Sequence, residues 1–467
     1  MPASYEIAVS RMFALGHELA QTPSAKFDLA HMRVLLAALE HPERRFPSVL
    51  IAGTNGKGST AATLASILRA SGLKNGLYTS PHLIRINERI RVNGQEIGDD
   101  DFARLHGEVD RVAEGLVERG ELPWHPSFFE MMTAIEFAYF ARQKVDIAVL
   151  EVGMGGRLDA TNVVEPLVSV IADISLDHQK FLGNTVGEIA REKAGIIRAG
   201  GVVVTLPQLA EANDVIGNTI LELGAVGVSA VQYVPPVSPG SDGYLERTKN
   251  LTAEDTGDTG HGNVRANYIY RYPLDVLGKE ILVETPLTGR HQLRNVALAV
   301  AAAEELNKQG FSGITPAAIE LGIRETQWPG RMQVLAAHSG WPEIVLDVAH
   351  NPAGAWALRS ALSERYEDRR LIFVFGAMRD KAISEMAEIL FPVADGVIAT
   401  RPENPRSATP EEIQEAGRRT GAEIESVVDV GAALERARSA AAGNGVMVVT
   451  GSIYLVGEAM RVLGVKA

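Results

Sequence analysis

The sequence contains no cysteine among its 467 residues. Disulfide bonds, thiolate metal sites and cysteine nucleophiles are therefore excluded, and any metal ion must be held by oxygen or nitrogen donors. The chain also lacks an apolar run long enough to span a bilayer, and its start lacks the basic and apolar regions of a signal peptide. We therefore expect a cytoplasmic protein with no membrane partner.

Positive charge is scarce relative to negative charge. Lysine and arginine number 45 against 58 aspartate and glutamate residues, which gives a formal net charge of −13. No dense basic run offsets this locally, so we expect no nucleic-acid partner. An acidic chain can still bind a nucleotide, because a glycine-rich turn and a helix N-terminus offer backbone N–H groups to phosphates. The length exceeds what one hydrophobic core usually supports, which favours two domains.

Apolar runs alternate with helical patterns through the first part of the chain. This alternation predicts a mostly parallel sheet covered by helices. The expected strands are Phe46–Gly53, Lys74–Thr79, Asp146–Gly153, Pro166–Ser175 and Gly201–Leu206, and the expected helices are Lys57–Ser71, Phe128–Lys144, Thr185–Ile197 and His291–Lys308.

A second α/β unit is predicted toward the C-terminus. Pro and Gly in Gln327–Arg331 interrupt a helical pattern there, so we place the domains at residues 1–327 and 328–467. The stretch Val234–Val264, rich in Gly, Pro, Asp and Thr, is expected to be loop or an irregular excursion. The second unit should contain strands Glu343–Val348, Arg370–Gly376, Gly396–Thr400 and Val446–Thr450, with helices Pro352–Glu364, Lys381–Leu390, Pro410–Gly421 and Val430–Ala442. The predicted fold class is α/β, with a P-loop domain of mostly parallel sheet followed by a smaller Rossmann-like domain.

One glycine-rich segment lies between an expected strand and an expected helix. Its residues are Gly53, Thr54, Asn55, Gly56, Lys57, Gly58, Ser59 and Thr60. Glycines let the backbone wrap around phosphates, Lys57 can contact their oxygens, and Ser59 or Thr60 can offer a hydroxyl to Mg2+. The spacing differs from that of the general P-loop, because residue 51 is Ile and Gly58 follows the lysine. A glycine-rich turn without a ligand is the alternative, which the strand–turn–helix context disfavours.

Acidic segments follow two further expected strands. Glu151–Asn162 and Asp173–His178 come after apolar runs, and Glu192-Lys193 lies on the helix beyond. In an open α/β sheet, loops beyond the strand C-termini form the ligand crevice, so these segments should lie near the glycine-rich loop. Such a loop is otherwise a helix cap or a turn, and a lone histidine at a strand end is more often structural than a ligand.

Together these segments resemble the folylpolyglutamate synthase/dihydrofolate synthase family, a branch of the Mur-ligase superfamily. The matching motifs occur in the order of that family: Gly53–Thr60, Thr79–Leu83, Phe129-Glu130, Glu151–Asn162, Asp177-His178, Glu192–Gly195, His291–Asn295, Pro329–Arg331, Asp347–Pro352 and Gly451–Leu455. Each motif is modest, but the ordered set is highly specific. The form of Arg157-Leu-Asp159 resembles that of bifunctional bacterial members.

The resemblance implies an ATP site and two Mg2+ ions. The nucleotide would be bound by the glycine-rich loop, with Asn295, Arg331 and Asp347 completing the site from the far side and Lys381 near them. One metal ion would be held by Ser59, Ser80 and Glu151, and the other by Glu151, His178 and a carbamylated Lys193. The alternatives are that Asn295 only faces the core of its helix, that Arg331 caps a turn, and that Lys193 stays cationic. A monovalent cation is also compatible with the family.

The resemblance further implies sites for a pterin acid and for L-glutamate. The pterin side would involve Ser80, Pro81, His82, Phe129 and Asp159, with Phe129 stacking on the ring and Asp159 accepting from its nitrogens. The glutamate side would involve His350 and Ser452. Arg406 has two readings, as a partner of a glutamate carboxylate or as a solvated loop arginine.

The expected reaction is ATP-dependent ligation of glutamate to dihydropteroate, to folyl-glutamates or to both, through an acyl phosphate, by a monomer. Lys57, Glu151, His178, Lys193 and His350 would be the catalytic residues. A peptidoglycan-precursor ligase is the close alternative, although the chain before residue 53 leaves little room for its additional N-terminal domain. A simple ATP-binding regulator would need no paired acidic metal ligands, and a metal-dependent hydrolase would need no phosphate loop.

Overall fold

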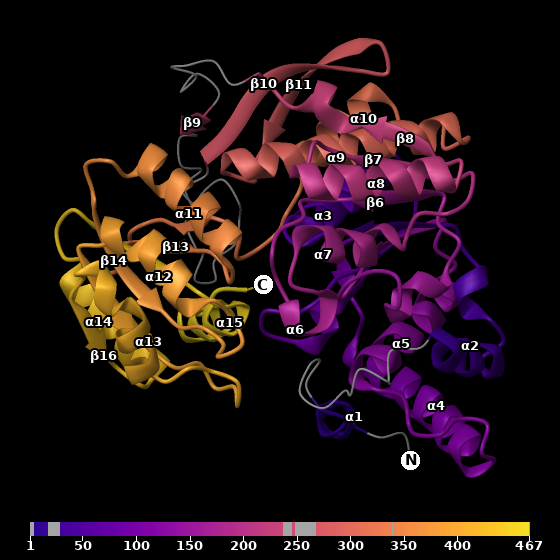
Figure 1. Ribbon diagram of the computed structural model, residues 1–467, viewed down its shortest axis with the longest axis horizontal. Coiled ribbons are helices and arrows are strands. Elements are labelled where there is room, and N and C mark those ends of the chain that lie inside the picture. Colours follow the sequence, from indigo (N-terminus) through magenta and orange to yellow (C-terminus); the bar gives the residue numbers. More distant parts are fainter. Residues whose placement is uncertain (1–3, 17–28, 237–244, 248–267, 339, 467) are drawn as a thin grey trace. The chain divides into compact units, whose positions relative to one another are not determined.

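The computed structural model describes residues 4–16, 29–236, 245–247, 268–338 and 340–466, which form two compact units (Figure 1). The first unit draws on Met1–Pro235, Pro273–Leu282 and Arg294–Thr326. The second draws on Pro236–Tyr272, Val283–Leu293 and Gln327–Ala467. Within the described ranges, no helix has the length and apolar character needed to cross a membrane.

The first unit is built on an eight-stranded sheet with the order β4-β3-β2-β5-β1-β6-β7-β8. The run from β2 to β8 is parallel, and β3 and β4 add antiparallel pairs at one edge. The strands are β1 (Ser48–Ala52), β2 (Asn75–Tyr78), β3 (Ile90–Val92), β4 (Gln95–Glu96), β5 (Ile147–Glu151), β6 (Val168–Ile171), β7 (Val202–Thr205) and β8 (Val226–Ser229). Every residue of β1 and β5 is buried, as expected for central parallel strands covered on both faces.

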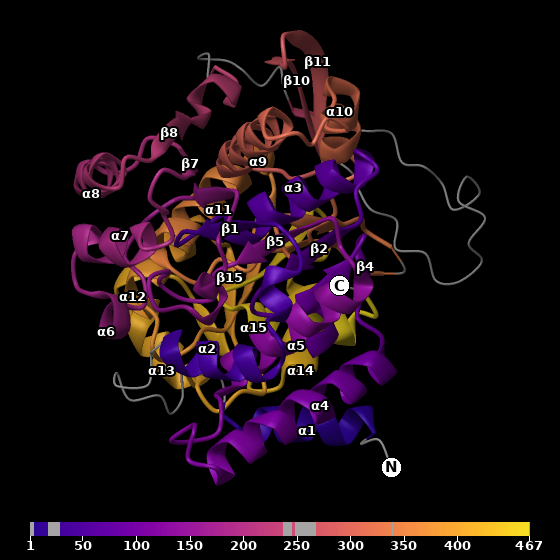
Figure 2. The same cartoon turned by 90° about the vertical axis from the view of Figure 1, so that its right-hand side faces the viewer.

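Helices cover both faces of this sheet. In Figure 2, α3 lies on one side of β1, β5 and β2, and α5 lies on the other. The helices are α1 (Tyr5–Ala14), α2 (Leu29–Ala38), α3 (Lys57–Ala70), α4 (Asp99–Glu118), α5 (Phe128–Gln143), α6 (Gln179–Leu182), α7 (Val186–Ala194), α8 (Ala210–Glu222), α9 (Arg290–Lys308) and α10 (Pro316–Arg324). The core around α5 includes the fully buried rings of Phe137 and Phe140 from α5 and of Phe102 from α4.

The strand register brings the loops of the first unit together. Ile51 of β1 pairs with Glu151 of β5, Ala52 pairs with Ile171 of β6, and Tyr78 of β2 pairs with Leu150 of β5. The carboxyl ends of four neighbouring parallel strands therefore meet at one edge of the sheet. Ligand loops of open α/β sheets occupy this position.

A three-stranded sheet has the order β11-β10-β9. Its strands are β9 (Leu245–Arg247), β10 (Tyr268–Val276) and β11 (Lys279–Thr285). Within Val234–Val264, which was expected to be loop or an irregular excursion, β9 pairs with β10 although its sequence has no strand pattern of its own. Residues 237–244 and 248–264 of that stretch lie outside the described residues.

The second unit contains a six-stranded sheet with the order β12-β13-β17-β14-β15-β16, parallel except at β12. Its elements are β12 (Gln333–Leu335), β13 (Glu343–Leu346), α11 (Pro352–Arg365), β14 (Arg370–Phe375), α12 (Ile383–Leu390), β15 (Gly396–Ala399), α13 (Pro410–Gly417), β16 (Ile424–Ser426), α14 (Val430–Ala440), β17 (Gly445–Thr450) and α15 (Ile453–Val462). In its core, Phe375 and Phe391 meet edge to face with ring centroids 5.2 Å apart. The predicted α/β fold class is confirmed in both units.

Candidate functional site

The glycine-rich loop leaves β1 at Gly53 and enters α3 at Lys57. The Thr54 amide donates to the Asp173 carbonyl at 2.6 Å, and the Thr54 hydroxyl donates to the Ser175 carbonyl at 3.0 Å. The Asn55 side-chain amide donates to the Ser175 hydroxyl at 3.1 Å. These bonds fasten the loop to the segment that follows β6, and they explain why Thr54 and Asn55 belong to the site as scaffold residues.

Gly56 occupies a position that no other residue fits. Its φ is +82°, and a Cβ added to it would lie 2.2 Å from Oδ1 of Asn295 on α9. A side chain here would meet both backbone strain and a buried amide. Asn295 thus belongs to the unit that carries the glycine-rich loop, and its expected role in nucleotide binding beside Arg331 and Asp347 stays a prediction.

Two lysine side chains converge on the first residue of the loop. The Lys57 ammonium donates to the carbonyls of Gly53 at 3.0 Å and Thr54 at 3.2 Å. Lys193, on α7, donates to the same Gly53 carbonyl at 2.8 Å. Burial and the positive charge of Lys57 lower the pKa of Lys193 to about 7. A large fraction of this amine is therefore neutral near pH 7.

Glu151 ends β5 beside the loop that follows β2. Its Oε2 accepts from the backbone N–H of Ser80 at 3.3 Å, and its side chain is buried. Ser59 and Thr60 are also buried at the start of α3, and the Thr60 hydroxyl has no hydrogen-bond partner among the described residues. The register therefore brings Ser80 and Glu151 to the edge of the sheet where α3 begins, with Ser59 in its first turn.

His178 precedes α6 in a left-handed backbone conformation with φ of 50°. Its Nε2 lies 3.9 Å from Oδ2 of Asp177, and its N–H donates to Oδ1 of the same carboxylate at 2.8 Å. A left-handed conformation is uncommon for histidine and occurs where the surroundings fix the backbone. This conformation gives His178 a defined direction in the loop that follows β6.

The predicted metal ligands differ from an ordinary cluster of acids and histidines. In the portion of the chain that is described, no three or more His, Asp or Glu side chains form a group able to hold a metal ion. The predicted set instead combines the hydroxyls of Ser59 and Ser80, the Glu151 carboxylate, His178 and Lys193. Hydroxyl and carboxylate oxygens fit Mg2+, whereas the Lys193 nitrogen fits only if a carbamate replaces its proton-bearing amine.

Phe129 packs against the loop after β5, and Asp159 ends that loop as the N-cap of the short helix Ala160–Val163. A Cβ on Gly153 would lie 2.4 Å from the Phe129 ring, so the ring covers this glycine. The Asp159 carboxylate accepts from the Thr161 N–H at 3.1 Å, from the Thr161 hydroxyl at 2.6 Å and from the Met154 N–H at 2.9 Å. Burial raises the pKa of Asp159, and these bonds offset part of that effect. Asp159 therefore shapes its own loop, in addition to the pterin contact that the resemblance implies.

Sequence reasoning missed two buried polar residues next to this loop and the loop after β2. Arg89 donates from Nε to Nδ1 of His82 at 2.8 Å. Glu136, on α5, is fully buried, and neither of its carboxylate oxygens has a hydrogen-bond partner in the described structure. Burial raises the pKa of Glu136 well above its usual value, and the charge of Asp159 adds to this rise. A glutamate among the apolar residues of an expected buried helix was a signal that could have been noticed.

Asp347, His350 and Ser452 lie in the second unit, at the carboxyl ends of β13 and β17. Asp347 accepts from the N–H groups of Met332 at 2.8 Å and Ala349 at 2.9 Å, and burial raises its pKa. Nδ1 of His350 lies 2.9 Å from the Val348 carbonyl oxygen. Ser452 begins α15, and its hydroxyl accepts from the N–H groups of Tyr454 and Leu455 at 3.1 and 3.2 Å. A backbone bond of 3.1 Å from Gly451 to Ala349 joins the two loops.

Arg406 forms an ion pair with Asp380, and both side chains are partly exposed. Its Nη2 lies 2.7 Å from both carboxylate oxygens of Asp380. Burial alone would raise the pKa of Asp380, but the Arg406 hydrogen bonds outweigh it and hold that pKa below its usual value. The neighbouring Lys381 donates its backbone N–H to Met378 at 3.0 Å. Arg331 donates to its neighbour Gly330 at 3.3 Å.

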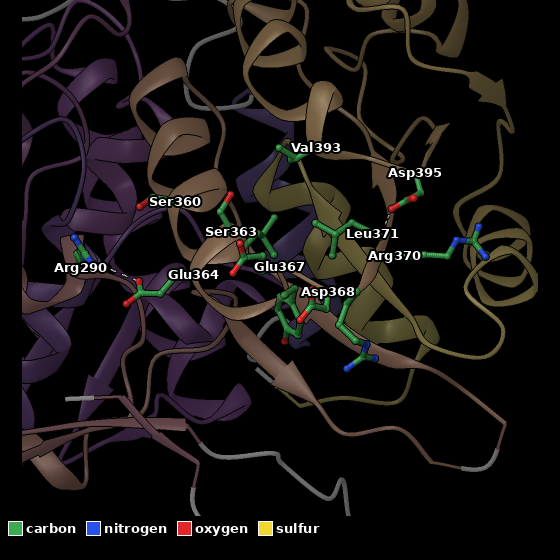
Figure 3. Close-up of a pocket in the computed structure, with 13 residues that line it drawn as sticks. Arg290, Ser360, Ser363, Glu364, Glu367, Asp368, Arg370, Leu371, Val393 and Asp395 are labelled. Atoms are coloured by element: carbon green, nitrogen blue, oxygen red, sulfur yellow. Dashed lines mark hydrogen bonds and ion pairs between the residues drawn. The ribbon is translucent and has the colours of Figure 1, made fainter. Parts of the chain in front are cut away.

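A hollow of about 950 Å3 lies elsewhere in the second unit (Figure 3). Its lining includes Arg370 at the start of β14 and Asp395 just before β15. Figure 3 shows Arg290 and Glu364 directed toward each other across one end, where they form an ion pair of 3.8 Å. Because the hollow lies at the amino ends of these strands, it is at the opposite edge of the sheet from Asp347, His350 and Ser452.

Comparison with known proteins places these observations in a family. Residues 125–303 match the Mur ligase middle domain, and residues 330–453 match the Mur ligase glutamate ligase domain. The chain is 34% identical over 438 residues to dihydrofolate synthase/folylpolyglutamate synthase of Bacillus subtilis, covering 92% of this chain and 93% of that protein.

Solved structures agree with the sequence relatives. Mycobacterium tuberculosis folylpolyglutamate synthase, complexed with ADP and AMPPCP, superposes with a TM-score of 0.81 at 30% identity, covering 98% of this chain and 99% of that one. E. coli FolC in complex with DHPP and ADP superposes with a TM-score of 0.78 at 28% identity, covering 99% and 98%. With its glycine-rich loop, its two Mur ligase domains and relatives that match over nearly its whole length, the chain belongs to the folylpolyglutamate synthase/dihydrofolate synthase family of Mur ligases.

Proposed function

We propose that the protein joins L-glutamate through an amide bond to a pterin-bearing carboxylic acid, using dihydropteroate as well as reduced folyl-glutamates. Membership of the family makes the chain an ATP-dependent acid–amino acid ligase. The observation that carries the proposal is the convergence of Lys57 and Lys193 on the Gly53 carbonyl, at the sheet edge where Glu151 meets Ser80. No observation favours the peptidoglycan-precursor alternative.

The chemistry requires activation of a carboxylate, because its leaving group would otherwise be oxide. Transfer of the ATP γ-phosphate to the carboxylate oxygen gives an acyl phosphate and ADP. The neutral amine of glutamate then attacks the acyl carbon, and the tetrahedral oxyanion collapses with phosphate as the leaving group and loss of one amine proton. The protein's tasks are therefore to position the reactants and to neutralise phosphate charge.

The glycine-rich loop has groups suited to the phosphates of ATP. Its backbone N–H groups lie at the N-terminus of α3, where helices bind phosphate. The Lys57 ammonium contacts carbonyls of the same loop, so a small movement of its side chain can bring it to phosphate oxygens. We assign Thr54, Asn55, Gly56, Gly58, Ser59 and Thr60 to this site, with Asn295 as the wall behind Gly56. The roles of Arg331, Asp347 and Lys381 in nucleotide binding stay predictions.

Two Mg2+ ions would supply charge neutralisation at the β- and γ-phosphates when bound. We assign Ser59, Ser80 and Glu151 to one ion, and Glu151, His178 and a carbamylated Lys193 to the other. The low pKa of Lys193 supports the carbamate, because only a neutral amine reacts with carbon dioxide.

The acceptor acid would contact the loops that follow β2 and β5. We assign Ser80, Pro81 and His82 to its carboxylate side, and Phe129 and Asp159 to its pterin ring. His350, Ser452 and Arg406 are assigned to incoming glutamate. For Arg406 this requires a glutamate carboxylate to compete with Asp380, which now holds the guanidinium.

The test is an assay of phosphate release by the purified protein with ATP and Mg2+. Dihydropteroate and tetrahydrofolate are offered separately, each with and without glutamate. We expect release that depends on both the pterin acid and glutamate, and amide products confirmed by mass. Release without an acceptor acid would contradict the ligase assignment, and activity with tetrahydrofolate alone would reject the bifunctional part.

A further inference from the structure

Arg89 is a buried arginine between two segments of the candidate acceptor-acid site. It ends the short helix Ile86–Arg89, just before β3, and only 2% of its surface is exposed. Its carbonyl accepts from the Thr79 N–H at 3.0 Å, immediately before Ser80. The residue is therefore fixed by its backbone to the base of the loop that carries His82.

The Arg89 side chain determines which nitrogen of His82 carries the proton. Its Nε–H points at Nδ1 of His82 with a separation of 2.8 Å. A guanidinium has donors and no acceptor, so Nδ1 must supply a lone pair. The imidazole proton is therefore on Nε2, which makes that atom a hydrogen-bond donor.

Aromatic rings pack against Arg89 and His82. The Arg89 guanidinium carbon lies 5.1 Å from the centre of the Phe128 ring, a cation–π contact at the first residue of α5. Phe13 of α1 stacks on Phe128 with ring centroids 5.9 Å apart and planes inclined by 20°, and it lies 6.3 Å from the His82 ring. These rings restrict the movement of Arg89 and His82, and they connect both to the helix turn that carries Phe129.

We propose that Arg89 is a positioning residue of the acceptor-acid site, which holds His82 as the Nε2–H tautomer so that the ring donates a hydrogen bond to an oxygen of the acceptor carboxylate. The inference rests on the proposed function for the identity of the ligand, a pterin-bearing carboxylic acid. A neutral donor suits this reaction, because the carboxylate must stay nucleophilic toward phosphorus. A full positive charge at hydrogen-bond distance would stabilise the free carboxylate more than the transferring one.

The tautomer is measured directly on the full chain by long-range 15N–1H NMR with labelled histidine. The His82→Gln variant identifies the signals of His82. We expect a protonated Nε2 and an unprotonated Nδ1 in the unmodified protein. A proton found on Nδ1 overturns the proposal, whether or not any variant folds. This measurement requires no turnover, so it stays informative if the proposed ligase activity fails.

The positioning role is tested kinetically with Arg89→Met and the matched control Arg91→Met. Arg91 is two residues further on and donates to the Glu88 carbonyl at 3.2 Å, so it shares the segment with Arg89. We expect Arg89→Met to raise the KM for the acceptor acid roughly three- to tenfold, the equivalent of one hydrogen bond, and to leave the KM for ATP unchanged. Arg89→Lys should recover part of the loss, because an ammonium also donates.

Three outcomes overturn the proposal: equal changes in both KM values, the same effect in Arg91→Met, or His82 in Arg89→Met keeping the tautomer of the parent. Thermal unfolding of each variant separates loss of folding from loss of positioning. If Arg89→Met does not fold, Arg89→Lys and the NMR measurement on the parent decide the question. Absence of any acceptor-dependent phosphate release in the parent would instead reject the proposed function.

Discussion

The Lys193 nitrogen lies 2.8 Å from the carbonyl oxygen of Gly53, inside the first unit and almost without exposure to solvent. A lysine in this position loses the hydration that normally favours its charge, and the Lys57 ammonium repels that charge further. The neutral amine is the form that adds to carbon dioxide, with release of one proton, to give a carbamate. The environment thus favours the modification that the proposed metal site needs.

Lys193→Ala should abolish ligase activity, and added acetate should restore part of it. The small carboxylate can occupy the space of the missing carbamate and supply an oxygen to the metal. Reactivation of decarbonated parent enzyme at a fixed concentration of dissolved carbon dioxide should become faster as the pH rises through about 7, because the neutral amine increases over that range.

The control for this prediction is Lys180→Ala, which removes an exposed lysine from α6 in the same region. It should keep its activity and respond to neither acetate nor bicarbonate. A fully active Lys193→Ala, or a high-resolution map of an unmodified amine with both metal ions bound, would contradict the carbamate.

Lys57→Ala should reduce amide formation by roughly 100-fold or more while the protein stays folded, because a phosphate-neutralising charge is lost. Ser59→Ala should have a comparable effect through the metal ion. Lys74→Ala is the matched control, because Lys74 contacts Gln143 at the amino end of β2, away from the loops. Steady-state kinetics and circular dichroism check the prediction, and near-normal turnover in Lys57→Ala would remove the phosphate-site assignment.

Asp159→Ala should impair the use of dihydropteroate much more than that of tetrahydrofolate. A site built to accept from pterin N–H groups discriminates strongly once its acceptor is removed. Because Asp159 also holds its own loop through Thr161, Thr161→Val is the necessary control. If Thr161→Val shows the same selectivity change, the effect is due to loop geometry and the pterin contact is rejected. Values of kcat/KM for both acids provide the measurement.

Glu136→Gln should stabilise the protein at neutral pH. The unfolded carboxyl titrates near 4.5, and burial raises the folded pKa well above this, so the unfolded state releases its proton first as the pH rises. Below pH 4.5 the Glu136 carboxyl is protonated in both states and does not lower the free energy of unfolding. As the pH rises from 4.5 to the folded pKa, the free energy of unfolding of the parent falls. The variant should gain roughly 1–2 °C in Tm for each kcal/mol recovered, because the unfolding entropy grows with chain length, and the gain should disappear in acid.

Glu130, on the same helix, should affect the pH dependence of stability in the opposite direction. Burial alone would raise its pKa, but hydrogen bonds from His31 and Ser127 outweigh burial and lower it. Its contribution to stability is present above pH 4.5 and is lost as the pH falls through the folded pKa. Glu130→Gln should therefore lower the Tm at neutral pH, and equal Tm shifts in the two variants would reject the assignment of charges.

Much of the fold could be predicted because hydrophobic period and strand–loop–helix order are local properties. Strand Phe46–Gly53 and helix Lys57–Ser71 correspond to β1 and α3 with ends that differ by a few residues. Helix α4 was missed although Phe102, Val109 and Leu116 repeat every seven residues and line one buried face, which was a signal the sequence offered. Strand β9 had no local signal, since its pairing with β10 depends on tertiary contacts.

The candidate site was predictable in its parts and not in its contacts. Spacing and resemblance identified the glycine-rich loop, but they did not indicate that Ser59 is buried. The bond between Arg89 and His82 depends on how the chain turns after β2. Likewise, the pairing of Arg406 with Asp380 could not be read from two loops that lie apart in the sequence.

The fit of Asn295 against Gly56 also has a consequence for synthesis on the ribosome. The glycine-rich loop emerges early, but the helix that supplies its wall is translated much later. Chains grow from the N-terminus and fold as their segments appear, so β1 and α3 are synthesised before α9 can place Asn295 against Gly56. Nascent chains arrested before residue 295 should therefore bind ATP more weakly than the full-length chain. Phosphate transfer should appear only when most of the polypeptide has been synthesised.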